Sequence, residues 1–182
     1  MRFSSVFALA SLIVSCLAST AADVQADATA IAAAATTLDG AVTAFAVVSG
    51  NTQALAIHVD NVALIAALNK GTTDLVAVTR QNLVPSTLSV INAAAILPAL
   101  VQFSATFSHA LTNLVAEKAA LLALTIGGSY NLIKQDLADL NSIVSQFESA
   151  LIAAIPVTLT ANATAVTVTI NSALTVALAA FT

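Results

Sequence analysis

The sequence predicts an all-α protein, an up-down antiparallel bundle of about five long helices. Three observations support this fold class. Apolar residues recur at helical spacing through most of the 182 residues. Alanine, the strongest helix former, occupies 42 positions. Glycine and proline, which end or interrupt helices, separate the apolar segments.

The first two helices are predicted from Asp23 to Ser49-Gly50 and from about Thr52 to Thr79, with Gly71 as a weakened turn. The first carries an apolar seam over three heptads: Val24, Ala28, Ile31, Ala35, Leu38, Val42 and Phe45. The second is predicted to direct one apolar face inward: Leu55, Val59, Val62, Ala66 and Val76.

Proline divides the middle of the chain. Pro85-Ser86 opens a segment carrying Leu88, Ile91 and Ala95. Pro98 then predicts a kink or break, because proline lacks the amide donor and clashes with the preceding turn. The pattern resumes and ends at Gly127-Gly128, with these apolar positions: Leu100, Phe103, Phe107, Leu111, Leu114 and Leu121.

The last two segments differ in clarity. From Ser129 to Ala154 a clean seam predicts a helix that Pro156 closes: Ile133, Leu137, Leu140, Val144, Phe147 and Leu151. From Val157 to Ile170 the chain is rich in threonine and valine, which suits a strand. Its apolar residues nevertheless keep helical spacing, and the helical context favours a helix.

Residues 1–22 read as a secretory signal peptide, which leaves one domain at 23–182. A basic start and the apolar run Phe7–Leu17 precede small residues, and cleavage is expected after Ala21 or Ala22. A membrane anchor is the alternative, although the run is short for a span. The box Ile13–Cys16 also resembles a bacterial lipoprotein site, which would leave a lipid on Cys16.

The composition limits the function classes. Hydrophobic residues make up 59% of the chain and charged residues 8%. Loss of Arg2 leaves four basic against nine acidic residues, a net charge of −5. Without a basic patch, nucleic acid is not an expected partner. Loss of Cys16, the only cysteine, excludes an internal disulfide.

Hydropathy alone would allow a membrane protein, because residues 83–116 and 149–182 lack Asp, Glu, Lys and Arg. Prolines interrupt the first stretch, however, and polar Thr, Asn and Ser are spread through the second. The chain also has no Trp for an interfacial belt. We therefore expect an exported protein that is not integral to a membrane.

No residue pattern indicates catalysis, a cofactor or a metal. His58 and His109 have no cysteine or HExxH partners, and no GxSxG or phosphate loop is present. Asp136 and Asp139 are expected on a solvated face beside Lys134. The sequon at Asn162 is a candidate for N-glycosylation if the source is eukaryotic. We predict that the protein is not an enzyme.

Three stretches resemble the fungal hydrophobic surface-binding protein A family, which is similar to the cell-wall galactomannoproteins. They are LAIHVDNVAL from Leu55, LTNLVAEKAA from Leu111, and IGG from Ile126 followed by LIKQDLADL from Leu132. The resemblance implies a secreted or cell-wall protein that adsorbs to hydrophobic solids and recruits hydrolases. For the galactomannoprotein relatives it implies fatty-acid binding within a five-helix bundle. The long Ser/Thr-rich tail of wall-linked relatives is absent, which puts covalent wall attachment in doubt.

Two hypotheses follow. In the first, alanine-rich seams leave an apolar void that takes up a long-chain fatty acid, lined by Leu38, Phe45, Val62, Phe103, Phe107, Leu137, Val144 and Phe147. The same residues would otherwise fill a tight core. In the second, the protein is a structural, adhesive wall protein without a ligand pocket, and its bundle spreads at an interface.

Overall fold

A computed structural model describes residues 19–47, 50–80, 87–124 and 128–182. These residues form six α-helices and one 3-10 helix, and they contain no strand, which confirms the all-α prediction for the described chain. Five helices have 21 to 30 residues, whereas α5 has five. The bounds are α2 Ala21–Val47, α3 Asn51–Arg80, α4 Val90–Ala116, α5 Lys118–Leu122, α6 Ser129–Ala154, η1 Val157–Leu159 and α7 Thr160–Ala180.

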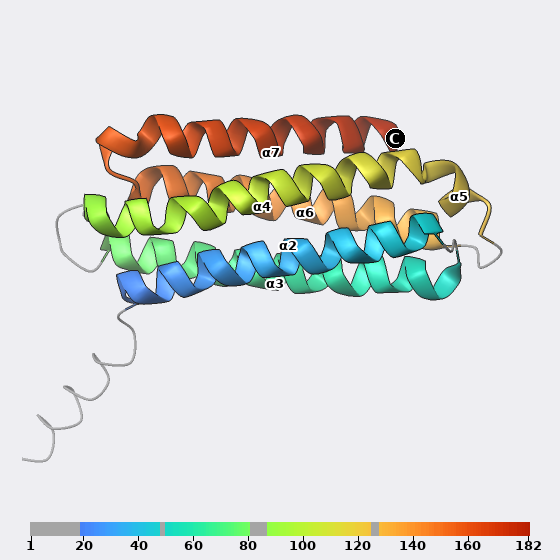
Figure 1. The fold of residues 1–182 in the computed structure, drawn as a ribbon, viewed down its shortest axis with the longest axis horizontal. Helices are drawn as coiled ribbons and strands as arrows, with labels where there is room; N and C mark the ends of the chain where they lie inside the picture. The colour runs from blue at the N-terminus through green and yellow to red at the C-terminus, as the bar shows by residue number, and fades with distance from the viewer. Residues whose placement is uncertain (1–18, 48–49, 81–86, 125–127) are drawn as a thin grey trace, which may run out of the picture.

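The five long helices form a closed ring around one core. Helix α2 packs against α3 and α4, α3 packs against α6, and α7 packs against both α4 and α6. Figure 1 shows three layers, with α7 above α4 and α6, and these above α2 and α3. Consecutive long helices run in opposite directions, as expected for an up-down chain. The ring therefore encloses side chains from all five helices.

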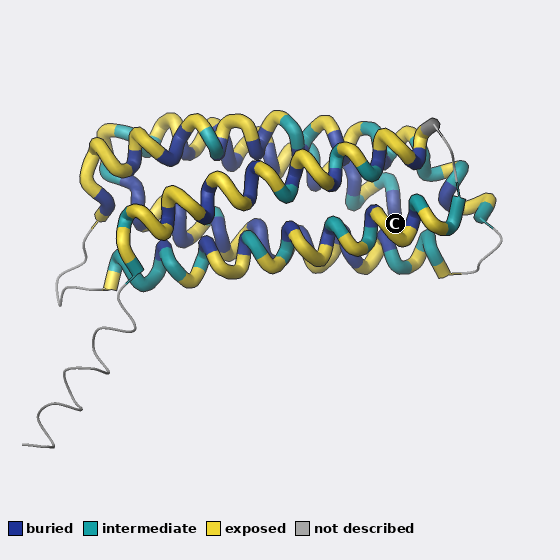
Figure 2. The backbone as a smooth tube through the Cα atoms, turned by 60° about the horizontal axis from the view of Figure 1, so that its bottom comes forward, coloured by how far each residue is buried: buried dark blue, intermediate teal, exposed yellow. Residues whose placement is uncertain are grey.

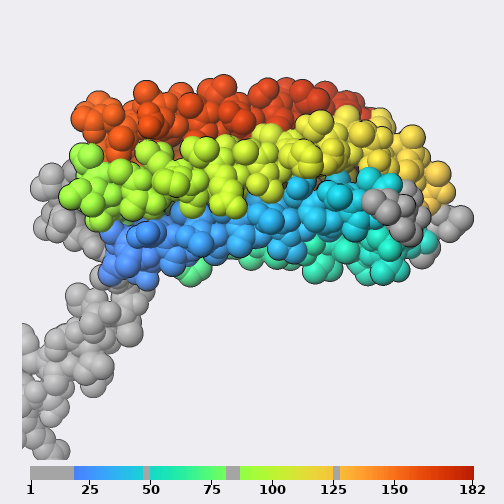
Figure 3. All heavy atoms as spheres, viewed as in Figure 1, coloured from blue at the N-terminus to red at the C-terminus, as the bar shows by residue number. Residues whose placement is uncertain are grey.

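Each helix buries one side and exposes the other (Figure 2). The predicted seams of α2 and α6 are buried at every named position, from Val24 to Phe45 and from Ile133 to Leu151. On the face shown in Figure 3, the atoms of α4 lie between those of α2 and α7 and meet both along the length of the bundle. In α2 and α6 the core is thus built from the stripes that the heptad spacing predicted.

The predicted inward face of α3 is wrong. Leu55, Val59 and Val62 lie on its outer side and are each at least 50% exposed. Apolar residues occupy most sides of this helix, so periodicity alone could not select the inward one. The buried stripe also contains small and polar residues, so the sequence did not identify it as the inward face. Its members are Ala54, Ile57, Asn61, Leu64, Leu68, Gly71 and Leu75.

Pro98 lies inside α4, which continues from Val90 to Ala116, so the predicted break is absent. Pro98 and Ala94, the residue one turn before it, are both exposed, so water can bind the carbonyl that Pro98 leaves without a donor. A kink there stays a prediction. Ile91 and Ala95, predicted to face inward, are exposed, while Ala93 and Ile96 are buried.

The Thr/Val-rich final segment is helical, as the context predicted. The short η1 follows Pro156, and α7 buries a narrow stripe of small and medium side chains. By length and hydropathy alone, four segments are capable of crossing a membrane: Ala21–Ala46, Asn51–Arg80, Val90–Ala116 and Val157–Ala180.

Polar residues at the start of α2 take part in the fold. The Thr20 amide and hydroxyl donate to Asp23 Oδ2 at 2.7 Å, and the Asp23 amide donates to Thr20 Oγ1 at 3.3 Å. This reciprocal arrangement is a capping box.

Most of the predicted signal peptide, with Cys16, lies outside the described residues, as do Ser49, Pro85-Ser86 and Gly127.

Candidate functional site

Seven of the eight residues predicted to line an interior site lie in one buried core, contributed by α2, α4 and α6. They are Leu38, Phe45, Phe103, Phe107, Leu137, Val144 and Phe147. The rings of Phe103 and Phe107 stack with centroids 5.4 Å apart. Val62 is the exception, because it lies on the outer side of α3 and is 50% exposed. It does not line the interior.

The interior is more tightly filled than the sequence suggested. A void between α2, α3, α4 and α6 has a volume of about 10 Å³, room for about one water molecule. Ligand pockets for small molecules are of the order of 300–1,000 Å³. Phe147 is the only predicted lining residue that borders this void. Small alanine and glycine side chains allow the helices to approach closely, so they do not leave the expected gap.

Gly71 illustrates this close approach. A methyl group added at its Cα would lie 3.0 Å from Ile31 Cδ1 and 3.4 Å from Phe147 Cε2. The glycine therefore allows α2 and α6 to meet α3 beside the void. Its position explains why α3 tolerates a residue that weakens helices in isolation.

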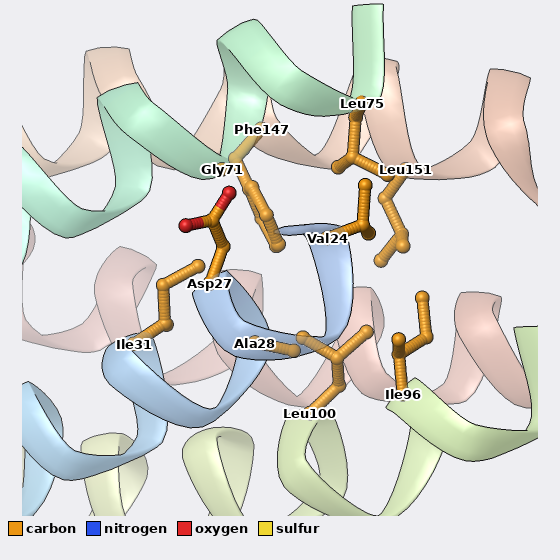
Figure 4. Close-up of a pocket in the computed structure, with 10 residues that line it drawn as sticks. All are labelled: Val24, Asp27, Ala28, Ile31, Gly71, Leu75, Ile96, Leu100, Phe147 and Leu151. Atoms are coloured by element: carbon orange, nitrogen blue, oxygen red, sulfur yellow. The ribbon is translucent and has the colours of Figure 1, made fainter. Parts of the chain in front are cut away.

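Asp27 is the one polar side chain on the wall of this void (Figure 4). It lies on the buried stripe of α2, three residues after Val24 and four before Ile31, and is only 5% exposed. Its Oδ1 accepts a hydrogen bond from Lys70 Nζ at 2.6 Å. Its Oδ2 is buried without a hydrogen-bond partner. The side chain that carries this unsatisfied oxygen thus borders an apolar space.

A small polar network surrounds Asp27 on its outer side. Lys70 Nζ also donates to Asp74 Oδ2 at 2.8 Å, and Ser19 Oγ donates to Asp74 Oδ1 at 2.6 Å. Burial and, to a smaller extent, the hydrogen-bonded Asp74 carboxyl raise the pKa of Asp27, against the lowering effect of Lys70. Burial also acts to raise the pKa of Asp74, but hydrogen bonds from Lys70 and Ser19 outweigh it, and that pKa is lowered. The two acids therefore differ in their affinity for a proton.

Asp136 is buried, contrary to the prediction of a solvated face. It is 4% exposed, and its two oxygens lie 2.9 and 3.0 Å from Nδ1 of His58 on α3. Burial raises the pKa of Asp136, and the His58 hydrogen bond opposes this rise. His109 makes a similar contact with Asp39 at 2.7 Å, joining α4 to α2. Both histidines therefore connect helices.

Two features lie on the outside of the bundle. Leu55, Val59 and Val62 form an exposed apolar stripe on α3, which we call the α3 stripe. Asn162, the sequon residue, lies on the exposed side of α7. Its side chain is accessible, and its glycosylation stays a prediction.

The site contains one residue that sequence reasoning missed. In the seam from Val24 to Phe45, Asp27 falls on the g position, beside the core position of Ala28. Charged residues are common at g positions, so the heptad spacing did not mark Asp27 as buried. The partner, Lys70, lies 43 residues further along the chain, and the spacing gave no indication of that contact.

No protein-family model matches the sequence, and no curated protein matches it significantly. Three solved structures share the fold. Ligand-binding domain 1 of the Penicillium marneffei MP1 protein, complexed with arachidonic acids, is 18% identical over 90% of this chain and 99% of that one, with a TM-score of 0.75. AFMP4P in complex with palmitic acid is 24% identical over 90% and 100%, with a TM-score of 0.77.

The third structure is ligand-binding domain 2 of the same MP1 protein, complexed with multiple arachidonic acids. It is 18% identical over 86% of this chain and 92% of that one, with a TM-score of 0.73. At these identities the likeness establishes the fold. The chain is therefore a helical bundle of the same architecture as these three domains.

Proposed function

We propose that the chain is a non-catalytic lipid-binding protein that takes an acyl chain into the interior of its bundle. The observation that carries the proposal is the shared fold: three domains of this architecture were solved with arachidonic or palmitic acid. The core of this chain offers a continuous apolar surface for such a guest, from Phe45 on α2 to Leu151 on α6.

Because the void is small, binding requires the helices to separate. Without a cysteine beyond Cys16, no internal disulfide opposes that separation. Burying a long acyl chain gains on the order of 10 kcal/mol. Ordering and association costs remove much of this, so we expect micromolar affinity.

The test is a saturation experiment on delipidated, purified protein. Palmitate is titrated at constant protein concentration, and bound lipid is counted by native mass spectrometry. The proposal predicts saturation at a small whole number of acids per chain, with helical circular dichroism retained. Uptake that rises without saturation, in proportion to added hydrophobic surface, would contradict an interior site.

The second candidate is the adhesive function without a pocket, and the α3 stripe favours it. Three apolar side chains on one exposed helix face, with Ile91 and Val157 elsewhere, give the folded chain a sticky surface. Replacing Leu55, Val59 and Val62 together by serine separates the two functions. Interior binding predicts unchanged palmitate saturation, whereas adhesion through this stripe predicts weaker adsorption to polystyrene.

We further propose that the protein is exported and functions outside a bilayer. Polar side chains on the outer helix surfaces support a position outside the bilayer: Lys70 on α3, which is charged, and His109 on α4 are 63% and 61% exposed. Both lie within segments apolar enough to span, where such groups would face hydrocarbon. Recovery of the chain from culture medium without detergent tests this, and recovery only in a detergent-extracted membrane fraction would overturn it.

A further inference from the structure

Asp27 has two different environments at its two oxygens. Oδ1 faces outward and accepts from Lys70, whose side chain is 63% exposed. Oδ2 is buried, has no hydrogen-bond partner, and belongs to the single polar side chain among the residues that border the apolar void. The other bordering residues are apolar, so the lining does not supply a second polar group there. The donor that completes this oxygen is therefore a water molecule, for which the void has room, or a polar group of a guest.

The chemistry of this oxygen limits the donor. An ionised carboxylate is only an acceptor, so a partner must bring an O–H or N–H group. A hydrogen bond from a hydroxyl or carboxylic acid to a carboxylate is short and about twice as strong as a neutral one. A ligand that ends in an ionised carboxylate brings no donor. Asp27 also repels the negative charge of such a ligand, because the site is removed from water.

We propose that Asp27 selects the polar group of the lipid, so that the interior favours apolar chains ending in a neutral hydroxyl or a protonated carboxyl over chains ending in an ionised carboxylate. This inference rests on the proposed lipid-binding function and specifies the class of ligand. The tail would extend from Asp27 along Leu100 of α4 and Phe147 and Leu151 of α6, which border the same void (Figure 4).

The charges near Asp27 all come from the outer side. Lys70 on α3 donates to both Asp27 and Asp74, the Asp74 carboxyl is hydrogen-bonded to Asp27, and Asp23 precedes Asp27 by one turn on α2. The bordering residues of α4 and α6 are all apolar. Lys70 offsets one negative charge, but Asp74 adds another. A bound acid and Asp27 must therefore share one proton, and affinity for a fatty acid should increase as the pH falls.

An alcohol with the same tail provides an internal control, because it carries its own proton at every pH. The experiment measures dissociation constants of 1-dodecanol and dodecanoic acid for the delipidated full-length exported protein at pH 8.0 and pH 5.5. For the wild type we expect dodecanoate to bind about tenfold more tightly at pH 5.5 than at pH 8.0. Dodecanol should bind equally at both.

The variant Asp27→Asn keeps the size of the side chain and adds an N–H donor. At pH 8.0 it should shift the ratio of the two dissociation constants by about tenfold or more in favour of dodecanoate. It should also lose the pH dependence of dodecanoate binding. The matched control is Asp136→Asn, a second buried carboxyl that faces His58 and does not border the void. Its ratio should equal that of the wild type.

Circular dichroism and urea unfolding establish that each variant folds. Asp27→Ser, whose hydroxyl also donates, replaces Asp27→Asn if that variant is unfolded. The proposal is overturned if both asparagine variants keep the wild-type ratio, or if both shift it equally. Wild-type protein that binds neither compound saturably would refute the lipid-binding function itself. Saturable binding of both compounds without an effect of Asp27 would refute the selection alone.

Discussion

Two buried carboxyls, Asp27 and Asp136, face α3 from opposite sides, and their environments differ. Both oxygens of Asp136 lie within 3.0 Å of His58 Nδ1. Asp27 instead has one oxygen bound by Lys70 and the other without a partner beside an apolar void. Burial raises the pKa of both side chains.

The difference separates a structural role from a functional one. A hydrogen-bonded buried pair fixes how two helices meet. Loss of one partner leaves the other buried without a hydrogen bond, which lowers the stability of the fold. An acceptor without a partner gains little stability for the folded state, and we therefore assign Asp27 to ligand selection and Asp136 to stability. The contrast leads us to expect opposite responses to the same substitution.

The largest effect is expected for Asp136→Leu. It removes the acceptor of His58 between α3 and α6, and we expect the free energy of unfolding to fall by about 2 kcal/mol. Urea unfolding followed by circular dichroism measures it. An unchanged midpoint would mean that the His58 contact does not stabilise the α3–α6 interface.

The capping box before Asp27 gives the next effect. Thr20→Ala should lower the free energy of unfolding by about 1 kcal/mol, because the Asp23 amide loses its side-chain acceptor.

Since Ser19 and Thr20 both bond within the fold, we also expect export to leave them in place. Cleavage after Ala18, with Cys16 as the other small residue, fits that expectation. Intact mass of the secreted chain decides between Ser19 and Ala22 or Asp23 as the first residue.

A smaller effect of opposite sign is expected for Asp27→Leu. The substitution removes an unsatisfied acceptor and adds apolar atoms at the void, while Lys70 keeps Asp74. We expect stability to stay equal or to rise by up to about 1 kcal/mol. The same urea titration measures it, and a loss as large as that of Asp136→Leu would remove the distinction between the two acids.

The smallest effect concerns pH. A carboxyl whose pKa is raised on folding binds its proton more tightly in the folded state, so stability falls as the pH rises above the ordinary value of 3.8. Asp136→Asn removes one such group. Its free energy of unfolding should therefore decline less steeply with pH than that of the wild type. Parallel declines would show that Asp136 does not contribute.

The sequence predicted the helices better than the direction they face. In α2 and α6 nearly all the large apolar residues lie on one stripe, and the outer positions carry alanine or polar residues, so the large side chains mark the buried side, as at Leu38 and Leu137. In α3 both sides are apolar, and the larger residues, Leu55 and Val59, lie outside. Which side of α3 faces inward depends on small residues such as Gly71. Gly71 allows α2 and α6 to approach closely, and this effect is visible only once those helices are in place.

Of the eight candidate lining residues, seven are buried, but only Phe147 borders the void. Heptad spacing brought together seven core residues, because a residue on a seam must meet other seams. The prediction for Val62 was wrong, because the predicted inward face of α3 lies on the outside. The contacts of Asp27 with Lys70 and of Asp136 with His58 span 43 and 78 residues, which no local pattern encodes. The size of the void also depends on how closely the helices approach, and composition alone does not determine that distance.

A crystal structure of the delipidated chain with 1-dodecanol tests the central claim most directly. We predict the alcohol oxygen within hydrogen-bonding distance of Asp27 Oδ2, with the tail among Leu100, Phe147 and Leu151 and the void enlarged around it. An alcohol bound only on the α3 stripe or in the surface hollow between α4 and α7, with the interior unchanged, would contradict the account.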